Sequence, residues 1–133
     1  MSNPERILRQ IAQRLSLRKP QEEALHILAK VLDTVPLGKN EDLVATLSAI
    51  SSLWPSVEDF ERDFPSVCFA LATGVGKTRL MGAFISYLYL TGRSKNFFVL
   101  APNTTIYDKL VADFSRQTSP KYVFRGIAEF ARS

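Results

Sequence analysis

Hydrophobic residues in the first half of the chain recur at the three- and four-residue spacing of an amphipathic helix. The first such segment follows Pro4, the second opens at Pro20 and the third begins after Asn40. A fourth, short helix is expected from Ser56, whose hydroxyl suits a helix N-cap and is followed three positions later by a carboxylate. The pattern therefore predicts an N-terminal helical segment over residues 1–64.

After Pro65 the hydrophobic pattern changes. Residues 67–71 and 97–101 are continuous apolar runs, which are typical of strands buried in a parallel sheet, and residues 122–124 suggest a third strand. Helical spacing returns between the first two runs, over residues 76–90, and again after the second run. Strands that alternate with helices predict right-handed parallel crossovers and an α/β fold.

The chain is thus expected to have two parts, a helical segment over 1–64 and the first part of an α/β domain over 65–133. The most apolar span, residues 80–90, is too short for a membrane helix, which needs about 20 residues. The N-terminus lacks the apolar core of a secretory signal. These features predict a soluble, cytoplasmic protein.

Charge and cysteine content add little to this picture. The formal net charge of +4 favours a polyanionic partner, but the basic residues are scattered and many basic proteins bind no nucleic acid. The single cysteine, Cys68, excludes a disulfide within the chain and is expected to be buried in the first strand. His26 is expected at the surface, and Trp54, Tyr87 and Tyr89 are expected to pack rather than to stack on bases.

The junction after the first apolar run carries most of a phosphate-binding loop. Residues 71–78 read LATGVGKT against the pattern G-x-x-x-x-G-K-[ST], so that only the first glycine is replaced, by Leu71. Glycines allow the backbone torsions and the close approach that let N–H groups surround a phosphate. The predicted ATP-binding residues of this loop are Thr73, Gly74, Val75, Gly76, Lys77 and Thr78.

Two of these side chains have expected chemical roles. Lys77, the candidate catalytic residue, can reach the β- and γ-phosphates, and the Thr78 hydroxyl can be a ligand of Mg²⁺. ATP and Mg²⁺ are the predicted cofactors. The alternative is a glycine turn ahead of a helix, with Lys77 solvated.

The stretch ATGVGKT resembles motif I of superfamily 2 helicases, and two further stretches support this resemblance. Upstream, residues 17–24 (LRKPQEEA) look like a Q motif, which implies that the Gln21 amide pairs with the adenine edge. The alternative is a helix N-terminus with Gln21 exposed. Arg18 and Lys19 could contact phosphate or be solvated.

Downstream, residues 98–110 (FVLAPNTTIYDKL) look like motif Ia, which contacts the nucleic-acid backbone. Hydroxyl side chains and free N–H groups at a helix start suit phosphate contact without base reading. The resemblance implies DNA-backbone contacts from Pro102, Asn103, Thr104 and Thr105. The alternative is a proline-led turn with a threonine as the helix cap.

Taken together, the three stretches resemble the N-terminal part of the Res subunits of type III restriction enzymes and their DEAD/DEAH-like relatives. The resemblance implies a RecA-like P-loop domain of an ATP-dependent helicase or translocase. Duplex DNA and a DNA methyltransferase (modification) subunit are the partners that it implies. The chain departs from the pattern at Leu71 and in the 56-residue spacing from Gln21 to Lys77.

ATP hydrolysis by such enzymes also needs an Asp-Glu pair, which holds Mg²⁺ and orients the attacking water. The sequence contains no Asp-Glu dipeptide. The chain is therefore expected to be an N-terminal fragment that binds ATP poorly and does not turn it over. Two other interpretations remain. One is a truncated, non-enzymatic nucleotide-binding or interaction remnant, and the other is a small kinase or G protein, which the absence of an Asn-Lys-x-Asp motif disfavours.

Overall fold

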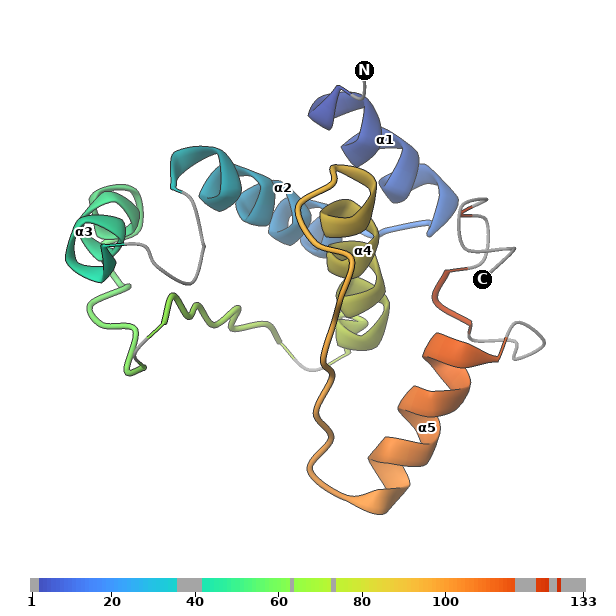
Figure 1. The fold of residues 1–133 in the computed structure, drawn as a ribbon. Coiled ribbons are helices and arrows are strands. Elements are labelled where there is room, and N and C mark those ends of the chain that lie inside the picture. Colours follow the sequence, from blue (N-terminus) through green and yellow to red (C-terminus); the bar gives the residue numbers. More distant parts are fainter. Residues whose placement is uncertain are drawn as a thin grey trace. The chain divides into compact units, whose positions relative to one another are not determined.

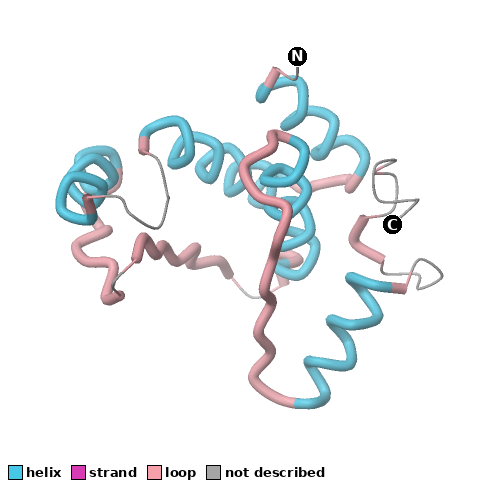
Figure 2. Tube along the Cα trace, in the orientation of Figure 1, coloured by secondary structure: helices cyan, strands magenta, loops and turns pink. Residues whose placement is uncertain are grey.

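The computed structural model describes residues 3–35, 42–62, 64–72, 74–116, 122–124 and 127. Within these ranges the chain forms five α-helices (Figure 1): α1 (Pro4–Arg14), α2 (Lys19–Thr34), α3 (Leu43–Leu53), α4 (Lys77–Leu90) and α5 (Thr104–Ser115). The described residues contain no β-strand, and Figure 2 shows only helix and loop for them.

The expectation of an α/β parallel sheet is therefore wrong for the described residues. Residues 67–71 and 97–101 follow loop paths instead of forming strands. A continuous apolar run makes a buried strand only when neighbouring strands bond its backbone and other elements cover both faces. The second run lacks such cover, since Phe98 is 87% exposed and Leu100 is 77% exposed.

Two smaller predictions also fail. Residues 122–124, expected as a third strand, end in a turn at Val123 and Phe124. The short helix expected from Ser56 does not form, because that residue lies in a turn and the Asp59 carboxylate instead accepts a hydrogen bond from Glu61 N at 3.0 Å. Such local carboxylate-to-backbone bonds stabilise turns in competition with a helix.

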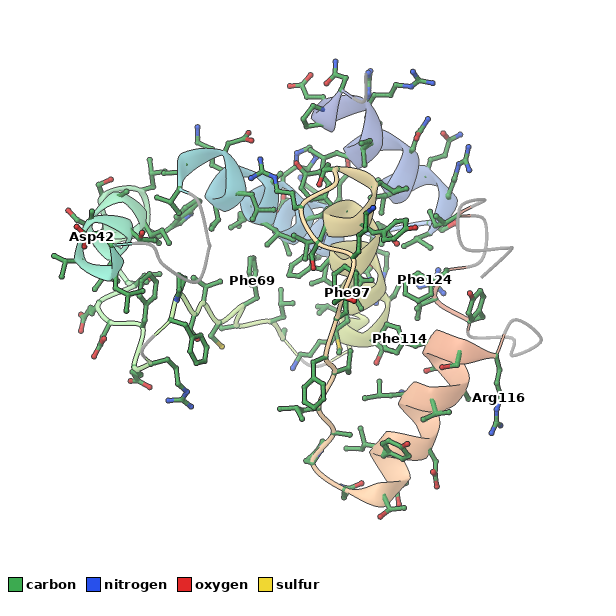
Figure 3. The ribbon with its side chains drawn as sticks, viewed as in Figure 1. Asp42, Phe69, Phe97, Phe114, Arg116 and Phe124 are labelled. Carbon is green, nitrogen blue, oxygen red and sulfur yellow. The ribbon has the colours of Figure 1, made fainter. Side chains whose placement is uncertain are left out.

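The chain divides into two compact units, of which the first comprises residues 1–25 and 72–133. Helix α1 packs against α4, and both contribute to a buried core. That core is made of Ile7, Leu8, Ile11, Leu15, Ala24, Leu25, Leu80, Ala83, Tyr87, Val123, Phe124 and Ile127. Phe114 of α5 lies against Phe124 (Figure 3), with ring centroids 5.6 Å apart.

The second unit comprises residues 26–71 and has its own core. Val31 and Val35 from the end of α2 pack with Ile50 of α3 and with Phe60. Trp54 is partly buried against this cluster, which confirms its expected packing role.

Local signals in the sequence explain where the helices begin. The Asn3 side chain accepts a hydrogen bond from Glu5 N and caps α1, with Pro4 in the first turn. Asp42 caps α3 through Val44 N and Ala45 N, while Asn40 lies outside the described residues. These caps provide acceptors for N–H groups that the helix itself leaves unpaired.

The sequence also predicted the exposure of two single residues, His26 and Cys68. His26 is exposed on α2, as expected. Cys68 is exposed, so the prediction of a buried core cysteine is wrong, because the strand that was to bury it does not form. None of the helices in the described part of the chain has the length and apolar character needed to cross a membrane.

Candidate functional site

The turn between α1 and α2 determines where the first site residues lie. Helix α1 ends in a Schellman motif, in which Ser16 N donates to Gln13 O and Leu17 N donates to Ala12 O. Ser16 has a φ of 51°, the left-handed conformation that this motif requires. The chain then enters α2 one residue after Arg18.

The glycine-rich loop leads directly into α4. Gly74 and Gly76 have φ values of 87° and 83°, in the left-handed region that disfavours residues with a Cβ atom. Gly76 is the N-cap of α4 and has no side chain to bond the helix N–H groups. The first N–H groups of α4 therefore face the loop with no capping side chain and with the positive end of the helix dipole.

Lys77 and Thr78 are the first two residues of α4, as the motif predicts. The Lys77 side chain is exposed, and Thr78 is half-buried. Thr73, which was also predicted to bind ATP, lies outside the described residues. The structure thus brings Gly74, Gly76, Lys77 and Thr78 together at one helix start.

Two side chains, one directly before α2 and one in its first turn, reach this loop from more than 50 positions away. Arg18 Nη2 donates to Gly74 O at 2.8 Å, and Gln21 Nε2 donates to Gly76 O at 3.0 Å. The Gln21 Oε1 atom also accepts a hydrogen bond from Arg18 N at 2.8 Å, and the side chain is only 2% exposed. The alternative of an exposed Gln21 is therefore wrong, and its amide is bonded to the loop.

The contact between Gln21 and Gly76 is sterically matched. A Cβ atom at position 76 would collide with Gln21 Nε2 and would lie 3.3 Å from Arg18 Nη2. A Cβ atom at position 74 would meet no other group within 4 Å. Sequence reasoning identified Gly76 by its torsion and missed this close approach, since the approaching side chains are distant in sequence.

Helix α4 is further tied to α1 by Arg79. Its Nη1 atom donates to Leu15 O at 2.5 Å, next to the turn that leads to α2. Arg79 directly follows Thr78, so this bond fixes the first turn of α4 relative to that turn.

The predicted DNA-contacting residues lie at the start of a different helix. Asn103 caps α5, with its Oδ1 atom accepting from Ile106 N at 2.9 Å. Pro102, Thr104 and Thr105 are exposed beside it. The cap is thus the asparagine, so the alternative in which a threonine caps the helix is wrong.

The site has the features of an anion-accepting helix start: a glycine loop, left-handed torsions, and a lysine and a threonine at the first helical positions. The described residues hold no cluster of three or more His, Cys, Asp or Glu side chains able to bind a metal ion.

The chain matches the family described as type III restriction enzyme, res subunit, over residues 14–131. It therefore belongs to this family, whose members are helicase-like subunits of type III restriction enzymes. Comparison with curated proteins and with solved structures found no match.

Proposed function

We propose that the loop of residues 74–78 binds the triphosphate of ATP. The observation that carries this proposal is the start of α4, where a side-chain-free, left-handed Gly76 is followed at once by Lys77 and Thr78. A capping side chain at position 76 would occupy the N–H groups that a phosphate needs, and here there is none.

The two side chains fit complementary parts of a Mg·ATP ligand. The exposed ammonium of Lys77 suits the β- and γ-phosphates, where charge is greatest. The Thr78 hydroxyl would hold Mg²⁺, which supplies positive charge to the bridging phosphate oxygens when it is bound. Membership of the family supports this assignment, because its helicases depend on ATP.

The proposed parent activity is ATP-dependent translocation on duplex DNA within a type III restriction enzyme, with a DNA methyltransferase subunit as partner. The exposed start of α5, residues 102–105, is the proposed contact with the DNA backbone. Selection of adenine by Gln21, which the resemblance implies, stays a competing prediction, and a comparison of ATP with GTP tests it. From these 133 residues alone we expect weak binding of nucleotide and no turnover, because they contain no Asp-Glu pair.

The direct test is nucleotide affinity in the Lys77→Ala variant. Removal of a charge-assisted contact to phosphate should weaken ATP binding by about 10- to 100-fold, measured by calorimetric titration with Mg²⁺ present. Lys30→Ala is the matched control, since Lys30 is an exposed lysine on α2 that lies in the other unit.

The control variant should bind ATP as the wild-type chain does. If Lys77→Ala and Lys30→Ala bound ATP equally well, Lys77 would not contact the phosphates and the loop assignment would fail. If the wild-type chain bound no nucleotide, the alternative of a non-enzymatic protein that acts through another surface would take its place.

A further inference from the structure

The two hydrogen bonds from the start of α2 to the glycine loop end on backbone carbonyls, not on side chains. Arg18 reaches Gly74 O across 56 positions of sequence, and Gln21 reaches Gly76 O across 55. The Gly76 carbonyl also accepts the first helical bond of α4, from Leu80 N at 3.1 Å. The start of α2 therefore holds two of the peptide groups that form the loop.

Holding a carbonyl also orients the next N–H group. In a trans peptide the C=O and the following N–H point in opposite directions, and the described residues contain no cis peptide bond. The Gly74 carbonyl faces the Arg18 guanidinium, so Val75 N–H points away from that guanidinium. In the same way, the Gly76 carbonyl faces the Gln21 amide, so Lys77 N–H points away from that amide.

The Gln21 side chain is well suited to this task because it is fixed on both sides. Its oxygen accepts from Arg18 N, its nitrogen donates to Gly76 O, and 2% of its surface is exposed. A buried amide is costly unless it is hydrogen-bonded, so these bonds favour a single orientation. A side chain buried to this extent presents its bonded atoms to the loop and little surface to a base.

We propose that Arg18 and Gln21 are positioning residues that orient the Val75 and Lys77 N–H groups for phosphate before nucleotide binds. This inference rests on the proposed nucleotide binding at the same loop. On this inference both residues support binding of the triphosphate and do not recognise the base. Their loss should therefore weaken every triphosphate ligand by the same factor.

The experiment compares ATP, GTP and inorganic tripolyphosphate on the full 133-residue chain with Mg²⁺. Arg18→Ala and Gln21→Ala should each weaken all three ligands by about tenfold, because each removes one bond that orders the loop. Lys19→Ala, which removes an exposed charge next to Arg18, should have a smaller effect, and so should Gln13→Ala on the exposed face of α1.

A second readout separates positioning from general stability. The amide resonances of Val75 and Lys77 should shift in Arg18→Ala and Gln21→Ala in the absence of any nucleotide, and should stay unchanged in Lys19→Ala and Gln13→Ala. Arg18 is exposed, so its replacement leaves the buried core intact even if the Gln21 variant is less stable.

Three results would overturn the inference. A loss confined to ATP would make the residues base readers, and unchanged affinities for all three ligands would leave them without a positioning role. In both cases Lys77→Ala would still weaken binding, so the proposed function would stand. Absence of triphosphate binding by the wild-type chain would instead remove the proposed function and this inference together.

Discussion

Helices α4 and α5 begin in opposite ways, although the sequence predicts a phosphate contact at both starts. The N-cap of α4 is Gly76, which has no side chain, and its carbonyl is held by Gln21 from α2. The N-cap of α5 is Asn103, which bonds Ile106 N with its own side chain. The start of α4 is held by a side chain that is distant in sequence, whereas the start of α5 is capped by its own N-cap side chain.

The difference shows what each helix start can offer to a ligand. At α4 the capping position leaves the N–H groups to an outside acceptor, and the contacts from Arg18 and Gln21 fix the loop without occupying those groups. At α5 the asparagine already satisfies one donor. The α4 start is therefore suited to a tightly held anion, and the α5 start suits a weaker, exposed contact.

The largest effect is expected when a side chain is added at Gly76, which tests the difference between the two helix starts directly. In Gly76→Ala the new Cβ atom meets Gln21 Nε2, which can move away only by giving up its bond to Gly76 O. Together with the left-handed torsion, this should lower the free energy of unfolding by about 3 kcal/mol. Chemical denaturation followed by circular dichroism measures the change, and the same variant should lose affinity for ATP.

Gly74→Ala is the matched control for that variant. It carries the same kind of torsion, with a φ of 87°, but a Cβ atom there meets nothing within 4 Å, so its cost should be about 1 to 2 kcal/mol. The steric part of the Gly76→Ala effect should disappear when Gln21→Ala is added. Equal costs at the two glycines would show that the torsion alone matters and that the approach of Gln21 does not.

A smaller effect is expected at the start of α5. Asn103→Ala removes the side chain that caps the helix and should destabilise the chain by about 1 kcal/mol. Asn103→Ser restores a capping oxygen and should recover most of that loss. Fluorescence of Trp54, the only tryptophan, reports on the other unit and should stay unchanged in the native state of both variants.

If Asn103→Ala were as stable as the wild-type chain, the Asn103 cap would contribute nothing to stability. The two helix starts would then differ in sequence but not in how they are stabilised. A loss as large as that of Gly76→Ala would mean that α5 depends on its cap as heavily as α4 depends on Gln21.

Local sequence signals were sufficient to predict the long helices. Pro4 marked the start of α1, and the glycine, lysine and threonine run marked the start of α4. These features act within one helical turn, so neighbouring residues determine them. The glycine torsions and the positions of Lys77 and Thr78 followed from the same short-range logic.

The strands could not be predicted in this way. The apolar run at 97–101 has the composition of a buried strand, yet a strand exists only if another segment bonds its edge and others cover its faces. Those conditions are non-local, and the run itself does not contain them. For the same reason the composition around Cys68 did not determine its exposure.

The contacts of Arg18 and Gln21 with the loop could not be predicted from the sequence either. Each joins residues more than 50 positions apart, and no local pattern specifies which carbonyl a side chain will reach. The stretch LRKPQ showed that Gln21 was a candidate, through its resemblance to a known motif. The structure shows that the partner of Gln21 is the backbone carbonyl of Gly76 in the glycine-rich loop.

The smallest predicted effect concerns binding of DNA at the α5 start. Thr104→Ala combined with Thr105→Ala should weaken duplex DNA binding by about two- to fivefold, because neutral hydroxyl contacts to phosphate contribute little each. The factor should be the same for unrelated DNA sequences, since phosphate contacts carry no sequence information. Fluorescence anisotropy at a fixed, low salt concentration measures it.

Two control variants accompany this double variant. Thr104→Ser with Thr105→Ser keeps both hydroxyls, and Ser115→Ala removes an exposed hydroxyl from the other end of α5. Both should bind DNA as the wild-type chain does. A double alanine variant with unchanged affinity would leave α5 as a self-capped structural helix. A loss that differed between DNA sequences would mean that these threonines read bases, which the exposed turn around Asn103 was not expected to do.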